Sequence, residues 1–203
     1  MTDDAPLFAD DFTGCEPGLI PNTYSPWGEY HCRTDLGRLG PWREATTHYS
    51  WRGAGGGCWR IADIDGRRVL EQQFWANRSY PLLVTGDSSW TEYRASICLQ
   101  LISDAAPAGL VVGYRHSRDF LALLAREDGL RLVRRRHGED TELAQCDAPT
   151  APGEWRKLAL ACNPGRITVL LDDREVAAAE VDVPGGGIGL IANAPARFAD
   201  VLV

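Results

Sequence analysis

Apolar and polar residues alternate along most of the chain with the two-residue period of a β-strand. Few windows show the period of about 3.6 residues that an amphipathic helix needs. The clearest alternating stretch is "TEYRASICLQL", residues 91–101. Its apolar members stand at every second position: Tyr93, Ala95, Ile97, Leu99 and Leu101. We therefore predict a long strand with one face in a core and the other face, which carries Arg94 and Gln100, toward solvent.

Turn signals separate the alternating segments. "DIDGRR" and "REDGLR" place Asp65-Gly66 and Asp128-Gly129 between two such segments each. Asp-Gly supplies the positive backbone dihedral angles that a tight hairpin needs. "NPGR" (163–166) and "LDDRE" (171–175) flank a further segment, "ITVLL". The spacing predicts roughly twelve to fourteen strands in an antiparallel arrangement of two packed sheets.

The chain has 203 residues, a length that fits a single all-β domain over 1–203. Strand signals are dense from residue 58 onward. Residues 13–57 are instead rich in glycine, proline and aromatic residues and show few strand signals. We interpret this segment as a long, loop-rich excursion that packs on the sandwich over its cleft, because loops of this length in a compact domain are usually functional or disordered and its aromatic residues argue against disorder.

The formal net charge of −7 argues against nucleic acid as a partner, since phosphate binding needs a basic face. No stretch approaches the roughly 18 apolar residues of a membrane span, so we expect no membrane partner. Met1 is followed by "TDD", not by a basic segment and an apolar run. We expect a cytoplasmic protein if Met1 is the natural start, and a secreted one if a signal peptide has been removed.

The six cysteines are widely and irregularly spaced, with no C-x-x-C pair, which argues against a zinc site. Cys162 follows Leu158 and Leu160 in an alternating segment and is predicted to lie in the core. Reduced thiols are one interpretation for the set. A disulfide is the other, with Cys15 and Cys32 as the first candidate pair.

The order of segments from "LFADDF" (7–12) through "CWRIADIDGRRVLEQ" (58–72) and "AGLVVGYRHSRDFLALL" (108–124) to "GGGIGLIANAPARFADVLV" (185–203) is distinctive. It resembles the concanavalin A-like, laminin-G-like jelly-roll superfamily of bacterial carbohydrate-active proteins. The resemblance covers 7–12 and 58–203. It implies a two-sheet antiparallel jelly-roll sandwich and a carbohydrate partner. The Glu-x-Asp-x-x-Glu strand of laminarinase-type enzymes and the Gln-x-His strand of jelly-roll alginate lyases are both missing from the sequence.

The resemblance also implies that the first and last strands are neighbours, which would bring Asp10 or Asp11 close to Asp200. Relatives often bind calcium near this place, through carboxylate and carbonyl oxygens. Calcium held by Asp11 and Asp200 is therefore one expectation, although the fold requires no cofactor. The alternative is that these aspartates hydrogen-bond the ends of their strands.

Strand parity, the rule that successive side chains of a strand point to opposite faces, predicts further site residues. If Leu70 is in the core, Glu71, Gln73 and Trp75 point outward. If Leu110, Val112 and Tyr114 are in the core, Arg115 points outward, as Arg94 does on its own strand. On one shared sheet these outward residues would line a groove, covered in part by aromatic residues of the excursion. The ligand-binding candidates are Trp42, Tyr49, Trp51, Gln73, Trp75, Arg94 and Arg115.

Sugars suit such a groove, because aromatic faces cover sugar C–H groups and polar groups bind hydroxyls. Arginines add a fork for a uronate carboxylate. We expect a carbohydrate-binding domain, with an acidic glycan as one ligand class and with further domains or subunits as partners. The alternatives are a small polysaccharide lyase or glycoside hydrolase with Glu71 or His48 as its acid/base, and a structural interaction module without a sugar ligand.

Overall fold

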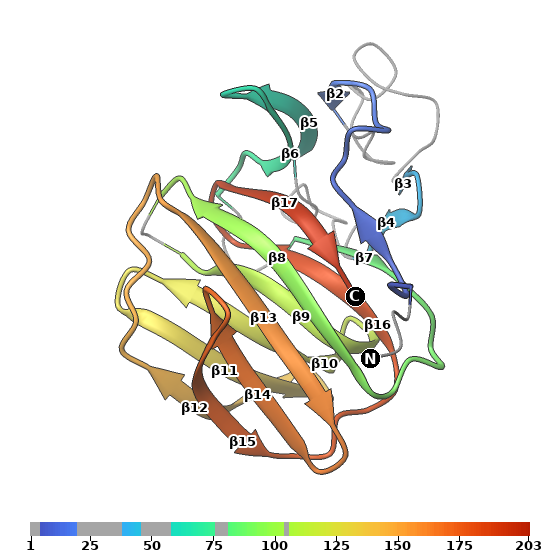
Figure 1. Ribbon diagram of the computed structural model, residues 1–203, viewed down its shortest axis with the longest axis vertical. Coiled ribbons are helices and arrows are strands. Elements are labelled where there is room, and N and C mark those ends of the chain that lie inside the picture. Colours follow the sequence, from blue (N-terminus) through green and yellow to red (C-terminus); the bar gives the residue numbers. More distant parts are fainter. Residues whose placement is uncertain (1–4, 20–37, 46–57, 76–80, 104–105) are drawn as a thin grey trace.

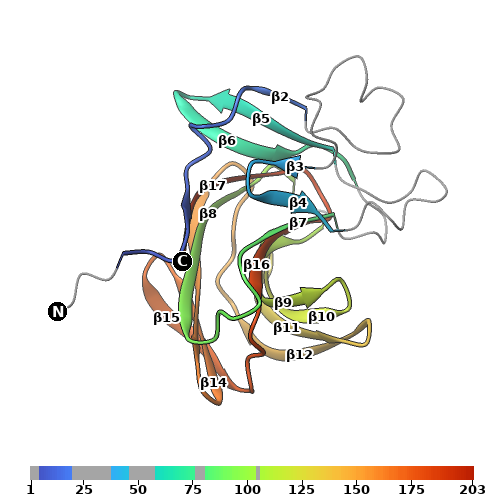
Figure 2. The same cartoon turned by 90° about the vertical axis from the view of Figure 1, so that its right-hand side faces the viewer.

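The computed structural model describes residues 5–19, 38–45, 58–75, 81–103 and 106–203. The regular elements of this part of the chain are all β-strands, arranged in two antiparallel sheets that pack face to face (Figure 1). Figure 2 shows the two layers from the side, with β8 and β17 in one layer and β9 and β16 in the other. The predicted jelly-roll sandwich is confirmed. No helix among the described residues is long and apolar enough to cross a membrane.

Among the described residues, one sheet has nine strands and contains both the first and the last of them. Its order is β15 (Arg174–Glu180), β14 (Arg166–Leu171), β13 (Trp155–Asn163), β8 (Tyr93–Leu101), β17 (Ala196–Leu202), β6 (Arg67–Gln72), β5 (Trp59–Ile64) and β2 (Gly18–Leu19), with β1 (Ala9–Asp10) pairing with β17. Within it, β5 and β6 form a hairpin whose turn residues Asp65 and Gly66 have φ angles of 52° and 78°. Both dihedral angles are positive, as an Asp-Gly hairpin turn requires.

The second sheet has eight strands and lies against the inner face of the first. Its order is β12 (Glu139–Cys146), β11 (Gly129–Arg136), β10 (Asp119–Arg126), β9 (Ala108–His116), β16 (Gly187–Ala192), β7 (Leu82–Thr85), β4 (Trp42–Glu44) and β3 (Arg38–Leu39). Among the described residues there are therefore 17 strands, more than the sequence predicted. The surplus consists of strands of two or three residues, which are too short for alternation to be read from the sequence.

The main core lies between the sheets and matches the alternation of the sequence. All five apolar residues of "YRASICLQL" are at most 7% exposed, and Cys162 is 2% exposed, as predicted. The largest fully buried side chains are Trp42, Trp59, Phe12 and Phe198. Burial of this apolar surface supplies the main favourable free energy of folding.

The two ends of the chain meet, as the resemblance implied. Ala9 and Asp10 of β1 pair with Leu202 and Val201 of β17. Two backbone hydrogen bonds extend the pairing, from the Phe8 amide to the Val203 carbonyl at 3.3 Å and back at 2.8 Å. The first and last strands of the described residues are therefore hydrogen-bonded neighbours in the nine-stranded sheet, where β17 is an interior strand between β8 and β6.

The segment predicted as an excursion contributes strands to both sheets. β2 pairs with β5 at the end of the nine-stranded sheet, and β3 and β4 extend the eight-stranded sheet beyond β7. Its remaining residues, 20–37 and 46–57, lie outside the described part of the chain. Cys32, one half of the candidate disulfide, is among them.

Strand β9 contains a bulge that reverses the predicted face of Tyr114. Gly113 has a φ of 58°, and the pairing of β9 with β16 shifts between Val111 and Tyr114. A bulge inserts an extra residue and so inverts the alternation beyond it. Leu110 and Val112 lie in the main core as predicted, but Tyr114 belongs to a second apolar cluster with Val111 on the other face of the sheet.

Candidate functional site

A row of four polar residues crosses the outer face of the nine-stranded sheet. Their apolar neighbours Ile61, Leu70, Phe198 and Leu99 belong to the main core, so the polar residues take the opposite face. The strand register places them side by side on β5, β6, β17 and β8. We call Arg60, Glu71, Arg197 and Gln100 the cross-strand row.

Hydrogen bonds run along the whole row. The Nε atom of Arg60 lies 2.9 Å from Oε1 of Glu71, and its Nη2 lies 2.8 Å from the same oxygen. From the other side, Nε of Arg197 donates to Oε2 of Glu71 at 2.8 Å. Arg197 Nη1 also donates to Oε1 of Gln100 at 2.9 Å, and Gln100 donates to the Gly153 carbonyl at 2.7 Å. Each member is thereby held by its neighbours.

Glu71 is the centre of this arrangement and is only 4% exposed. Gln73 adds a further hydrogen bond to Oε1, with an N–O distance of 3.2 Å. Burial raises the pKa of the Glu71 carboxyl, but the hydrogen bond from Arg197 and the charge of Arg60 outweigh it and lower the pKa below its ordinary value. A carboxylate that is ionised and saturated with donors is poorly suited to act as a general acid. The geometry favours a structural role for Glu71.

Two exposed aromatic residues follow Glu71 at the end of β6. Phe74 is 63% exposed and Trp75 is 55% exposed. The backbone of Phe74 is anchored by the side-chain amide of Gln72, which is fully buried. Its Oε1 accepts a hydrogen bond from the Phe74 amide, and its Nε2 donates to the Phe74 carbonyl at 2.8 Å and to the Ala192 carbonyl at 3.1 Å. Phe74 is therefore held through its backbone by a hydrogen-bonded group inside the protein, and Trp75 follows it directly in the chain.

The prediction that Arg94 and Arg115 share one sheet is wrong. Arg94 lies on β8 of the nine-stranded sheet, whereas Arg115 lies on β9 of the eight-stranded sheet. Arg94 pairs with Asp173, and Arg115 is 3.9 Å from Asp119. Strand parity tells which face of a strand a residue occupies, but it does not tell which sheet the strand joins. The single groove proposed from parity does not exist.

Trp42 is a core residue, not a surface for ligand. Its side chain has no exposure and packs against Phe8 and Phe12, with ring centroids 5.7 Å and 6.2 Å away. The sequence around Trp42 shows no alternation from which a strand could be predicted. In the structure Trp42 begins the short strand β4 and points into the core. His48, Tyr49 and Trp51 lie outside the described residues.

Asp11 and Asp200 each have a partner of their own. Asp11 accepts hydrogen bonds from the hydroxyl and the amide of Thr13 at 2.6 Å and 2.9 Å. Asp200 pairs with Arg67, whose guanidinium lies 4.5 Å from the centre of the Trp155 ring. Calcium takes six to eight oxygen ligands, and no group of three His, Cys, Asp or Glu side chains suited to a metal occurs in the described ranges. Thr13 and Arg67 compete with calcium for the carboxylate oxygens of Asp11 and Asp200, so these contacts give the calcium expectation no support, and chelation is the experiment that tests it.

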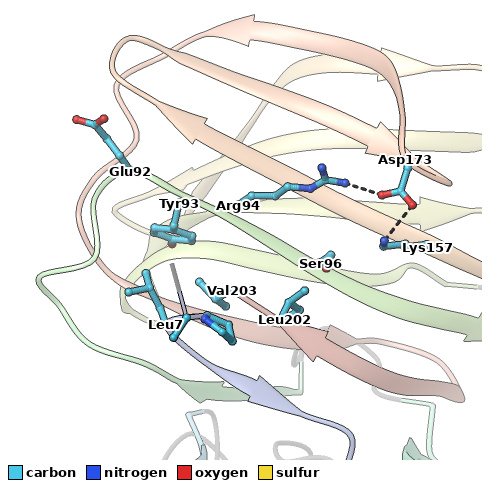
Figure 3. Close-up of a pocket in the computed structure, with 11 residues that line it drawn as sticks. Leu7, Glu92, Tyr93, Arg94, Ser96, Lys157, Asp173, Leu202 and Val203 are labelled. Atoms are coloured by element: carbon cyan, nitrogen blue, oxygen red, sulfur yellow. Dashed lines mark hydrogen bonds and ion pairs between the residues drawn. The ribbon is translucent and has the colours of Figure 1, made fainter. Parts of the chain in front are cut away.

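A hollow of about 690 Å³ lies on the outer face of the same sheet, at the opposite end of β8 from Gln100 (Figure 3). One side is apolar and includes Leu7 and Leu202. The other side carries Arg94 and Lys157, which share the carboxylate of Asp173 at 2.6 Å and 2.9 Å. A hydrogen bond from Lys157, together with the charges of both cations, lowers the pKa of Asp173. The positive charge of Arg94 is thus already paired.

The sequence analysis missed Arg60 and Arg197. Arg60 could have been found, because counting back from the two-residue turn at Asp65-Gly66 pairs it with Glu71. Arg197 had no such signal. It lies 126 residues from Glu71 in the chain, and only the pairing of β17 with β6 brings the two together.

No family model and no curated protein sequence matches the chain. Several solved structures share its fold. The carbohydrate-binding module CBM66 from Bacillus subtilis has 17% sequence identity and a TM-score of 0.63, over 79% of this chain and 93% of that chain. SCLam, a non-specific endo-β-1,3(4)-glucanase of family GH16, has 11% identity and a TM-score of 0.61, over 100% of this chain and 92% of that chain. The laminarinase from Rhodothermus marinus has 16% identity and a TM-score of 0.56, over 96% and 85%.

Proposed function

We propose that this domain binds a carbohydrate on the outer face of the nine-stranded sheet, beside the cross-strand row. The observation that carries the proposal is the exposed adjacent pair Phe74 and Trp75, with the backbone of Phe74 anchored by buried Gln72. Folding gains little free energy from an exposed aromatic ring, because its apolar surface stays in water. Binding can use that surface, since an aromatic face covers the C–H groups of a sugar ring.

The surroundings of the aromatic pair suit a sugar ligand. Trp75 is four residues from Glu71, which places it within about 14 Å of the row along an extended chain. The row offers planar guanidinium and amide groups held in fixed positions, and such preorganised polar groups bind hydroxyls at a small entropic cost. The fold agrees with the proposal, since CBM66 is by its name a carbohydrate-binding module.

The enzyme alternative has less support from the described residues. Glu71 is ionised and saturated with hydrogen bonds, and the other acid/base candidate, His48, is not described. Two catalytic carboxylates flanking one bond are the usual requirement for glycoside hydrolysis. The cross-strand row holds a single carboxylate between two arginines, an arrangement that favours binding over catalysis.

A glycan array with the wild-type protein and three variants tests the proposal. We expect wild-type binding to at least one glycan class, and Trp75→Ala and Phe74→Ala to weaken it roughly tenfold, equivalent to about 1.4 kcal/mol. Leu7→Ala is the matched control, because Leu7 is a 56% exposed apolar residue at the hollow beside Arg94, at the opposite end of β8 from Gln100. Absence of binding to every glycan, or wild-type affinity in Trp75→Ala, would refute the proposal. A reducing-end assay on the bound glycans tests the enzyme alternative.

A further inference from the structure

Both arginines of the cross-strand row have guanidinium N–H groups that bind no protein acceptor among the described residues. A guanidinium carries five N–H groups. Arg60 contacts protein through Nε and Nη2, and Arg197 through Nε and Nη1. Three N–H groups of each guanidinium therefore have no protein partner within the described ranges. Both side chains reach solvent, with 38% of Arg60 and 24% of Arg197 exposed.

The acceptors of the row, in contrast, are already engaged. Oε1 of Glu71 accepts from Arg60 and Gln73, and its Oε2 accepts from Arg197. Oε1 of Gln100 accepts from Arg197. A ligand that reaches the row therefore meets mainly N–H donors, so it must bring acceptors.

The charge of the row points the same way. Two guanidinium groups flank one carboxylate, which leaves an excess of one positive charge on a protein whose net charge is −7. The adjoining Arg67 and Asp200 neutralise one another and do not reduce this excess. Hydrogen bonds from a guanidinium to an ionised acceptor are about twice as strong as those between neutral groups, and the guanidinium fork matches a carboxylate.

We propose that the glycan bound at this face is a polyuronate, with a sugar carboxylate accepting hydrogen bonds from Arg60 and Arg197. This inference rests on the proposed carbohydrate-binding function and adds the chemical class of the ligand. The aromatic pair supplies contact with the sugar rings, and the arginine pair discriminates acidic rings from neutral ones.

The test compares polymers that differ only in charge. Wild-type protein is titrated with polygalacturonate and with alginate, each beside its own carboxyl-reduced form. We expect the reduced, neutral polymer to bind at least roughly tenfold more weakly, because only the carboxylate has been lost. We also expect binding of the acidic polymer to weaken at about 1 M salt, where the Debye length is about 3 Å.

Variants locate the contact on the sheet. Arg60→Gln and Arg197→Lys should each weaken binding of the acidic polymer by a larger factor than binding of the reduced polymer. Glutamine lacks the positive charge, and lysine retains the charge but lacks the planar fork that matches a carboxylate. Arg94→Ala is the matched control. This substitution removes a positive charge from the same face of the sheet, but at the far end of β8, about 20 Å from Gln100. The Arg94 guanidinium is already paired there with Asp173. We expect wild-type affinity in this control.

Each outcome is decisive. If no glycan of any class binds, the proposed function itself fails. If glycans bind but the acidic and reduced polymers bind equally, or only neutral glycans bind, the domain still binds carbohydrate and the polyuronate inference is overturned. If Arg94→Ala weakens binding as much as Arg60→Gln does, the anionic contact lies at the hollow and the assignment to the cross-strand row is overturned. Comparing acidic and reduced polymers on wild-type protein keeps the test valid even if an arginine variant fails to fold.

Discussion

The indole Nε1 of Trp42 donates a hydrogen bond to Oδ2 of Asp10 at a distance of 2.8 Å. Trp42 belongs to the eight-stranded sheet and Asp10 to the nine-stranded sheet, so this bond joins the two layers. The other carboxylate oxygen of Asp10 accepts from the Phe12 amide at 2.7 Å. Of the two aspartates in "LFADDF", Asp10 is thus the one that links the two sheets.

Asp10→Ala should lower the free energy of unfolding by about 1–3 kcal/mol, because it leaves the buried indole N–H of Trp42 without its acceptor. Urea denaturation followed by tryptophan fluorescence measures the change. Asp11→Ala is the control, since its hydrogen-bond partner among the described residues is nearby Thr13 at the surface. Equal stability of wild type and Asp10→Ala would mean that the bond contributes nothing.

Glu71→Gln should destabilise the protein by about 1–3 kcal/mol, because Arg60 and Arg197 lose their shared carboxylate. The figure is below that for a fully buried pair, since both arginines reach solvent. The structure predicts that binding weakens too, because both arginines lose the group that positions them.

The same residue predicts a pH dependence. The pKa of Glu71 is lower in the folded protein than its ordinary value of 4.5, so the folded state holds the proton less tightly than the unfolded state does. The stabilisation is therefore complete above pH 4.5 and is lost as the pH falls through the lowered pKa. Urea midpoints of wild type and Glu71→Gln should differ at neutral pH and converge in acid. A difference that stays constant down to about pH 3 would contradict this assignment.

Gly109→Ala should be severely destabilising. A Cβ atom at this position would lie 1.8 Å from the backbone oxygen of Leu123 on the neighbouring strand. Because that atom is part of the sheet, strand β10 would have to move, at a cost of about 3 kcal/mol or more. Gly14→Ala should change stability by less than about 0.5 kcal/mol, since no atom lies within 4 Å of its Cβ position and its φ is not positive. Thermal melts of the two variants make the comparison.

Gln72→Leu and Trp75→Ala should distinguish two roles: Gln72 anchors the backbone of Phe74, and Trp75 contacts the glycan. Gln72→Leu leaves the Phe74 backbone and the Ala192 carbonyl without the buried amide, so we expect a loss of about 1–3 kcal/mol in stability and weaker glycan binding. Trp75→Ala should weaken binding and leave the melting temperature nearly unchanged, because its side chain is 55% exposed. A large drop in stability with Trp75→Ala would show that the indole supports the fold.

Chelation should leave the melting temperature unchanged, because Asp11 and Asp200 already bind Thr13 and Arg67. A metal that binds only the folded state would stabilise it, so its removal would lower the melting temperature. Melting curves recorded after exhaustive chelation and after readdition of calcium distinguish the two outcomes. A reversible drop would establish the calcium site that the resemblance implied.

The sequence by itself determined which face of its own strand most residues occupy. The alternation over 93–101 correctly placed five residues in the core, and Asp65-Gly66 correctly placed a hairpin turn. Core placement and the turn were predicted correctly because burial on one face and turn geometry are local properties, set by residues a few positions apart. The pairing of the two ends was implied instead by the resemblance to a known fold.

Only the tertiary structure decided which strands share a sheet. Arg94 and Arg115 were separated because β8 and β9 join different sheets, and Tyr114 changed face because the bulge at Gly113 inverted the alternation. Arg197 joined Glu71 because β17 pairs with β6 across more than half of the chain. Strand pairing depends on contacts between distant segments, whose free energies compete with those of other registers. A period of two residues along one strand carries no information about that competition.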